Sequence, residues 1–163
     1  MADYSIPVWA RIGHVHLKVS DIQQSLDFYT GLLWFELITM YGTDAAFISA
    51  GGYHHHIGLN TWQSKWAGPA PDYATGLYHV AILYPTRKDL AVIVQRLLDE
   101  KYSLSGASDH WVSEAIYLED PDGNGLELYR DRPQDQWPRN DDGSIAMWTK
   151  SLDMAGLLGE ITD

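Results

Sequence analysis

His14, His79 and Glu127 are side chains of the kinds that bind metal ions, and each lies in or at the start of a strand-like segment. Two imidazoles and one carboxylate leave neighbouring positions open on an octahedral ion, a pattern typical of non-haem Fe(II) sites. Mn(II), Ni(II), Co(II) and Zn(II) accept the same donors. The three residues therefore predict a divalent metal site, for which iron is the first candidate.

Glu127 follows the turn-rich run DPDGNG (120–125) and lies between Leu126 and Leu128. Alternate residues of a strand face opposite ways, so the two leucines share one face and Glu127 takes the other. A carboxylate in such a place could simply face solvent. Applied to every predicted strand, alternation sends six polar side chains to one concave face: His14, His54, His56, His79, Tyr117 and Glu127. We expect His55 to face the helix side or an edge.

The elements that must position these residues occur twice along the chain. Each copy reads as a βαβββ unit, and the segment 67–76 links the two. In the first unit the strands are expected at 12–21, 34–42, 45–50 and 53–62, with a helix at 20–33. In the second they are expected at 76–85, 103–108, 112–118 and 125–131, with a helix at 86–102.

The predicted fold class is α+β: two tandem βαβββ repeats, at about 12–62 and 77–131, in one domain spanning 1–163. A four-stranded sheet with one helix leaves a face uncovered, so the repeats are expected to form a curved mixed-sheet cup or half-barrel with the helices outside. The C-terminal extension, 132–163, is expected to contain a short helix near 151–158.

Composition narrows the possible partners and compartments. The formal net charge is −11, which disfavours nucleic acid and anionic membranes as partners. The absence of cysteine excludes disulfides, thiolate metal sites and cysteine nucleophiles. The N-terminus lacks the pattern of a signal peptide, and no apolar run is long enough to span a membrane, so a cytoplasmic protein is expected.

Three segments resemble the vicinal oxygen chelate superfamily, which includes glyoxalase I, extradiol dioxygenases, and fosfomycin- and bleomycin-resistance proteins. The resemblance rests on GHVHLKVSDIQQSLDFYTGLL, on YHVAI, and on SDHWVSEAIYLEDPDGNGLELYRDRP. Within the superfamily the sequence is most similar to catechol 2,3-dioxygenase-type proteins. The resemblance implies an Fe(II) extradiol dioxygenase that binds a catechol-like substrate through two neighbouring oxygens and uses O₂.

The same resemblance implies residue roles. The metal ligands would be His14, His79 and Glu127. His56 would be the acid–base residue beside the oxygen, Tyr117 would bind the substrate, and His110 loosely matches a further histidine around the metal site. Glyoxalase I takes an additional carboxylate from the last strand of its first repeat, and the stretch HHHIGLN has none.

Two other functions use the same scaffold. One is a glyoxalase-like metal-dependent lyase or isomerase without O₂ chemistry. The other is a metal-free binding protein of the bleomycin-resistance type. A homodimer is expected from the base rate for such proteins, with the cup formed within one chain or by exchange of repeats between two.

Overall fold

The structure is a computed structural model, and it describes residues 5–161. The chain divides into two compact units between Ala67 and Gly68, at the start of the segment predicted as a linker. Each unit contains the predicted βαβββ motif, so the α+β fold of two tandem repeats is confirmed. That the two repeats share one cup, within a single domain, stays a prediction.

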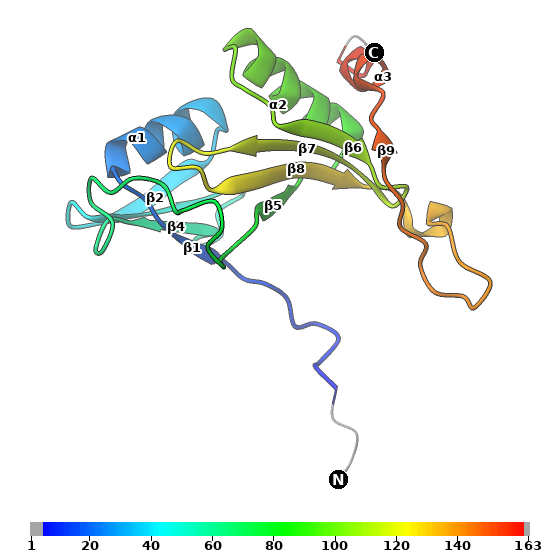
Figure 1. The fold of residues 1–163 in the computed structure, drawn as a ribbon, viewed down its shortest axis with the longest axis horizontal. Coiled ribbons are helices and arrows are strands. Elements are labelled where there is room, and N and C mark those ends of the chain that lie inside the picture. The colour runs from blue at the N-terminus through cyan, green and yellow to red at the C-terminus, as the bar shows by residue number, and fades with distance from the viewer. Residues whose placement is uncertain (1–4, 162–163) are drawn as a thin grey trace. The chain divides into compact units, whose positions relative to one another are not determined.

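The first unit is a four-stranded mixed sheet with a helix on one face (Figure 1). Its strand order is β1-β4-β3-β2, in which only β1 and β4 are parallel. The elements are β1 (Val15–Lys18), α1 (Ile22–Leu26), the π-helical turn η1 (Asp27–Leu32), β2 (Glu36–Tyr41), β3 (Ala45–Ser49) and β4 (Ile57–Asn60).

A helix cap and the burial of alternate residues account for where α1 begins and how β1 is oriented. The carboxylate of Asp21 accepts a hydrogen bond from the Gln24 N–H at 3.0 Å, which satisfies an otherwise unpaired donor at the start of α1. Leu17 and Val19 are buried, whereas His16 before them and Lys18 between them are exposed. This alternation confirms that the polar residues of β1 face away from the helix.

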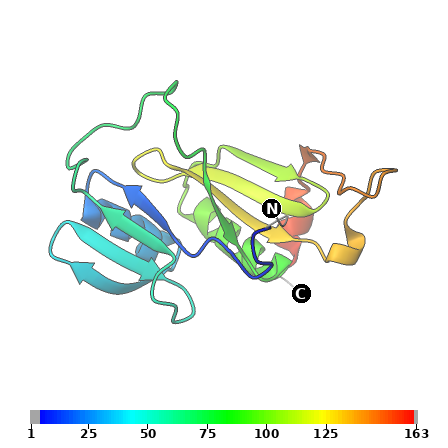
Figure 2. The same cartoon turned by 90° about the horizontal axis from the view of Figure 1, so that it is seen from below.

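The second unit has five strands, in the order β5-β8-β7-β6-β9 (Figure 2). Here β5 and β8 are parallel, and the other neighbouring pairs are antiparallel. The elements are β5 (Val80–Leu83), α2 (Arg87–Asp99), β6 (Gly106–Asp109), β7 (Ser113–Glu119), β8 (Gly125–Asp131), the 3₁₀ turn η2 (Gln134–Gln136), β9 (Lys150–Ser151) and α3 (Met154–Gly159).

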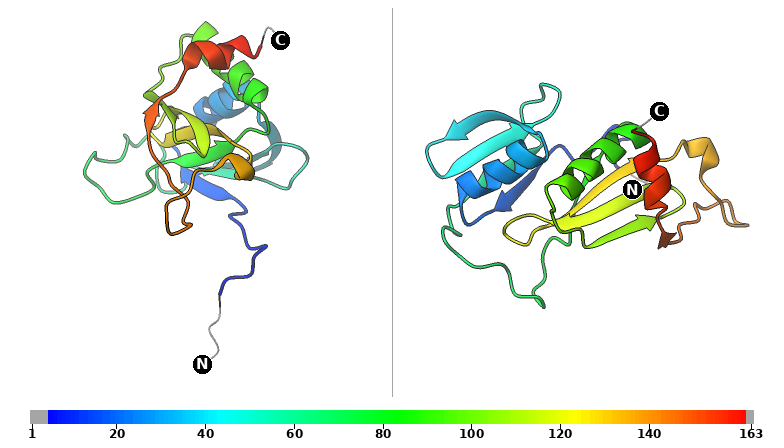
Figure 3. Two further views of the ribbon diagram at one scale, coloured as in Figure 1. Left: turned by 90° about the vertical axis from the view of Figure 1, so that its right-hand side faces the viewer. Right: turned by 90° about the horizontal axis from the view of Figure 1, so that it is seen from above.

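The C-terminal extension is built into this second unit. It adds β9 to the edge of the sheet at β6, and its helix α3 lies beside α2 (Figure 3). Arg87 joins the two helices, because its guanidinium donates to the Gly156 carbonyl at 2.8 Å and to the Glu160 carboxylate at 2.7 Å. The helix predicted at 151–158 therefore forms slightly later, where the Asp153 carboxylate caps it.

Several predicted elements differ in extent from the observed ones; the strands predicted at 12–21 and 76–85, for example, shorten to β1 and β5. The first helix changes to a π-helical turn after Leu26, and the strand predicted at 103–108 begins only at Gly106. The strand predicted at 53–62 is reduced to β4. Gly51 and Gly52 form a turn with φ of +65° and +75°, and residues 53–56 after this turn have no regular strand structure. Among residues 5–161, no helix has both the length and the apolar character needed to cross a bilayer.

Candidate metal and catalytic site

The turn before β8 is held by one buried carboxylate. Asp120 accepts hydrogen bonds from the backbone N–H groups of Asp122 and Asn124, both at 2.9 Å, and from the Asn124 side chain at 2.9 Å. Gly123 supplies the positive φ, +80°, that this tight turn requires. The turn therefore sets the position at which β8 starts, and with it the face to which Glu127 points.

Glu127 faces away from the hydrophobic core of the second unit. Leu126 and Leu128 are 1% and 0% exposed, on the face that packs against α2. Glu127 lies opposite Tyr117 of β7 and opposite Ala81 of β5 in the sheet register. Residues directly opposite one another share a face, so Glu127 and Tyr117 stand side by side on the surface away from α2.

A row of close polar contacts connects five side chains on this surface. The His79 Nε2 atom lies 2.9 Å from Glu127 Oε2, and the Tyr117 hydroxyl donates to Glu127 Oε1 at 3.3 Å. His110 Nε2 lies 2.6 Å from the same hydroxyl, and His110 Nδ1 lies 3.0 Å from Thr149 Oγ1. The second unit thus brings together His79, His110, Tyr117 and Glu127, and adds Thr149, which sequence reasoning missed.

Tyr117 keeps its proton over the whole neutral range. Burial, followed by the negative charge of Glu127 and the hydrogen bond to it, raises the pKa of the Tyr117 hydroxyl to about 12. The hydroxyl is therefore a donor toward the carboxylate. A pocket of about 490 Å³ opens beside His79 and Tyr117 at the end of the sheet nearest the β7–β8 turn.

In the first unit, His14 and His56 lie at the same end of two neighbouring strands. His14 directly precedes β1 and His56 directly precedes β4, and these strands are parallel with Val15 opposite Ile57. The Val15 N–H donates to the His56 carbonyl at 3.0 Å. Both histidines are exposed. The site residues of this unit are therefore adjacent on the face away from α1.

The hydrogen bonds of His56 determine which ring nitrogen is free. The Ala50 N–H donates to His56 Nδ1 at 3.3 Å, and the Ser49 hydroxyl lies 2.9 Å from the same atom. A backbone N–H can only donate, so Nδ1 is an acceptor and the ring proton is on Nε2. His56 consequently presents an Nε2–H group that is able to donate to an anionic oxygen.

The two repeats place different residues at the position of the carboxylate. Val15 pairs with Ile57 as Val80 pairs with Leu126, so Gly58 is the repeat equivalent of Glu127. The ring of His16 covers Gly58, since a Cβ added there would lie 2.9 Å from the ring. The first repeat therefore supplies no matching carboxylate, which favours three protein ligands over four.

His55 does not lie as the sequence predicted, whereas the direction of His54 stays a prediction. His55 was expected to face the helix side or an edge, but its ring lies 4.4 Å from that of His14 and 5.0 Å from that of Phe47, on the open face. The prediction was wrong because residues 53–56 precede β4 and do not alternate. His54 stacks on Tyr53 at 4.1 Å, so strand alternation does not determine its direction.

The donor pair in the second unit has the spacing that a metal ion requires. Two ligand atoms about 2.1 Å from an ion and at right angles are about 3.0 Å apart. The 2.9 Å between His79 Nε2 and Glu127 Oε2 matches that spacing. Within either unit alone, the described residues hold no group of three His, Asp or Glu side chains placed to bind an ion. His14 belongs to the other unit, and its role as a ligand stays a prediction.

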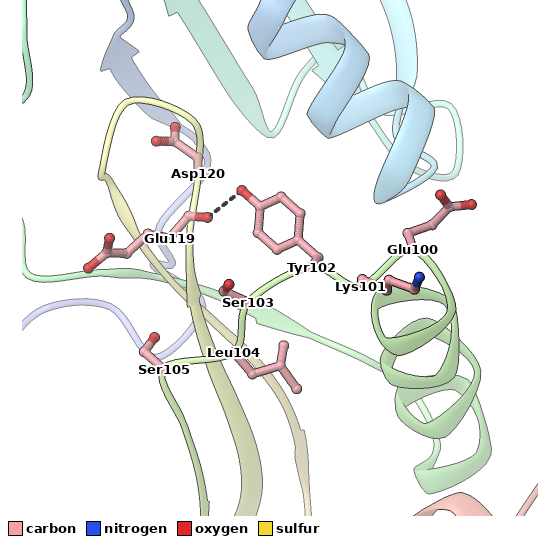
Figure 4. A pocket seen from close by; sticks show the side chains of 8 residues that line it. All are labelled: Glu100, Lys101, Tyr102, Ser103, Leu104, Ser105, Glu119 and Asp120. Carbon is pink, nitrogen blue, oxygen red and sulfur yellow. Dashed lines mark hydrogen bonds between the residues drawn. The ribbon is translucent and has the colours of Figure 1, made fainter.

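A second pocket lies away from this row. It has a volume of about 460 Å³ and is formed by the loop after α2 and the start of the β7–β8 turn (Figure 4). The Tyr102 hydroxyl spans it and donates to the Glu119 carbonyl at 2.8 Å. The Asp120 carboxylate is already used in the turn. Tyr102 and Asp120 therefore have structural roles in this pocket.

The chain is similar in sequence to a known protein family and to two dioxygenases. The model of the Glyoxalase/Bleomycin resistance protein/Dioxygenase superfamily matches residues 11–128. A catechol-2,3-dioxygenase of Bacillus subtilis (strain 168) is 38% identical over 153 residues, which is 93% of this chain and 52% of that protein. A biphenyl-2,3-diol 1,2-dioxygenase of Rhodococcus globerulus is 27% identical over 121 residues, which is 74% of this chain and 63% of that protein.

Solved structures share the fold at lower identity. A glyoxalase/dioxygenase from Nostoc punctiforme superposes with a TM-score of 0.63 at 19% identity, over 80% of this chain and 100% of that one. A lactoylglutathione lyase from Agrobacterium tumefaciens gives 0.59 at 18% identity, over 77% and 96%. This chain spans about half the length of the Bacillus subtilis relative.

Proposed function

Because this chain belongs to the glyoxalase/bleomycin resistance protein/dioxygenase superfamily of vicinal oxygen chelate proteins, we propose that it is an Fe(II)-dependent extradiol dioxygenase. Its substrates would be a catechol-like aromatic and O₂, and its product a ring-opened semialdehyde. The observation that carries the proposal is the pair His79 Nε2 and Glu127 Oε2, 2.9 Å apart, with Tyr117 hydrogen-bonded to the same carboxylate.

In this proposal the metal is held by His79, Glu127 and His14. Two neutral imidazoles and one carboxylate suit Fe(II) and leave adjacent positions for other oxygen ligands. The similarity to a catechol-2,3-dioxygenase favours iron among the divalent metals. Bound there, Fe(II) would bring the two neighbouring oxygens of the substrate and O₂ together and would carry electrons between them.

The protein's own residues would orient the substrate and move protons. Tyr117 retains its phenolic proton at neutral pH, so it can donate a hydrogen bond to a substrate oxygen beside Glu127. His110 Nε2 lies 2.6 Å from the Tyr117 hydroxyl and helps to hold it in place. His56 presents Nε2–H, which can stabilise negative charge on a reduced oxygen and return a proton to it. Cytoplasmic localisation and a homodimer belong to the same proposal.

The test is anaerobic purification, reconstitution with Fe(II), and measurement of O₂ uptake with a panel that includes catechol and biphenyl-2,3-diol. We expect O₂ consumption together with a ring-opened semialdehyde. His79→Ala and Glu127→Ala should lose iron and activity. His56→Ala should retain iron and lose about 10²–10⁴-fold in turnover, whereas His54→Ala, two residues away, should retain both.

Two outcomes would replace this function with another. An iron-loaded protein that consumes no O₂ with any diol, but converts the adduct of methylglyoxal with a thiol, would be a glyoxalase-like lyase. A protein that binds aromatic ligands and takes up no divalent metal would be a binding protein of the bleomycin-resistance type.

A further inference from the structure

The C-terminal extension pairs with the corner that carries His110. Strand β9 runs antiparallel to β6, with Ser151 opposite Ser108 and Lys150 opposite Asp109 (Figure 1). Continued by one residue, this register places Thr149 opposite His110. The extension therefore meets a residue of the candidate site through ordinary strand pairing.

The side chains of residues 148–150, at and before the start of β9, contact residues 109–111 in the same register. The Lys150 ammonium lies 3.4 Å from an Asp109 carboxylate oxygen and 4.9 Å from the centre of the Trp111 ring. The Trp148 ring packs edge-on against Trp111 at 5.8 Å. Between these two contacts, Thr149 Oγ1 lies 3.0 Å from His110 Nδ1. Three consecutive residues of the extension thus contact the three residues 109–111.

One arrangement of protons gives each hydrogen bond from Thr149 to Glu127 a donor and an acceptor. When the Tyr117 proton points to Glu127 Oε1, at 3.3 Å, the Tyr117 oxygen accepts from His110 Nε2, at 2.6 Å. His110 then carries its proton on Nε2, and Nδ1 is an acceptor. The Thr149 hydroxyl donates into that acceptor at 3.0 Å. In this arrangement Thr149, His110 and Tyr117 each donate in the direction of Glu127.

We propose that Thr149 is a positioning residue that holds His110 as the Nε2–H tautomer and so keeps the His110–Tyr117 pair donating toward the substrate oxygen beside Glu127. The inference deepens the proposed function, on which its catalytic part rests. Without the Thr149 hydroxyl, His110 Nδ1 would be free to take the proton, and Nε2 would then compete for the Tyr117 proton that Glu127 now receives. The C-terminal extension would thereby be part of the catalytic site.

The test compares Thr149→Val, which keeps the shape and removes the hydroxyl, with Thr149→Ser, which keeps the hydroxyl. The tautomer of His110 is read from ¹⁵N NMR of the imidazole in the full-length, metal-free protein. We expect the Nε2–H form in the original protein and in Thr149→Ser, and a shift toward Nδ1–H in Thr149→Val. In the iron-loaded enzyme, Thr149→Val should lower kcat about tenfold, with KM for the diol and iron content changed less than twofold.

Ser151→Ala is the matched control, because Ser151 lies in β9 two residues after Thr149, is exposed and pairs with Ser108 instead of His110. If Thr149→Val disturbs folding, Thr149→Ala is measured instead. An unchanged His110 tautomer, or equal losses in the Val and Ser variants, would overturn the inference. The NMR result needs no turnover, so it decides the role of Thr149 even if the protein fails to cleave catechols.

Discussion

Asp109 ties the end of β6 to Arg132 and makes the fold sensitive to acid. Its two carboxylate oxygens accept from the two terminal nitrogens of Arg132 at 2.7 and 2.8 Å, and its side chain is 8% exposed. These hydrogen bonds from Arg132 are the main cause that lowers the pKa of Asp109 to about 2. A carboxylate with a lowered pKa in the folded state stabilises the protein above its unfolded-state pKa.

We therefore expect the free energy of unfolding to fall as the pH drops from about 4 to about 2, by up to about 2 kcal/mol from this group. Asp109→Asn should lack this part of the pH dependence and should be less stable at pH 7, because Arg132 would lose its bidentate partner. Urea unfolding between pH 2 and 6 measures both effects. Asp72→Asn, in the exposed linker, is the control; an Asp109→Asn profile parallel to that of the original protein would contradict the assignment.

At the same scale, the sequence predicted the site residues whose positions follow from strand alternation. Tyr117 and Glu127 share a face because the register places them opposite one another, and period-two alternation already indicates that face. Thr149 could not be predicted in this way. Its contact with His110 spans 39 residues and depends on a strand of two residues, which has no periodicity to detect.

At the scale of elements, the close approach of β5 to β8 depends on Gly125. A Cβ at this position would lie 2.2 Å from the Tyr78 carbonyl oxygen and 3.2 Å from the Cβ of His79. The obstacle is backbone, so it cannot be relieved by rotating a side chain. Gly125 is therefore required for the spacing between β8, which carries Glu127, and β5, which His79 directly precedes.

Gly125→Ala should push the start of β5 away from β8, lower the free energy of unfolding by about 1–3 kcal/mol, and weaken metal binding. Chemical denaturation and metal titration of the metal-free protein measure the two effects. Gly76→Ala is the control, since a Cβ there meets no atom within 4 Å. A Gly125→Ala protein with unchanged stability and metal affinity would show that the strands tolerate the added methyl group.

The sequence predicted well those elements whose apolar residues recur with a clear helical or strand period. Helix α2 begins after the predicted cap Thr86, whose hydroxyl accepts from the Asp89 N–H at 3.0 Å. The π-helical turn after Leu26 was not predicted, because the apolar pattern of 20–33 is equally compatible with a continuous α-helix. The extra edge strand β9 was missed for the same reason as Thr149.

On the scale of the whole molecule, the two repeats have diverged in what they offer a metal. The second repeat holds His79, Glu127 and the contacts of Tyr117 and His110 with that carboxylate, and the C-terminal extension adds Thr149 to them. The first repeat holds His14 and His56, and has Gly58 where the second has Glu127. If one ion takes ligands from both repeats, metal binding must couple the stability of the two units.

Thermal unfolding in the presence of Fe(II) measures this coupling. With Fe(II) added anaerobically at about 100 times its dissociation constant, binding stabilises the folded state by about 2.7 kcal/mol, which raises the melting temperature of a chain of this size by about 5–10 °C. Calorimetry should show this rise for the original protein and for His54→Ala, but not for His14→Ala or His79→Ala. A rise retained in His14→Ala and lost in His79→Ala would mean that the second repeat binds the ion without His14. A rise that increases with protein concentration would mean that His14 comes from a second copy of the chain, because the ligand set then forms only on association.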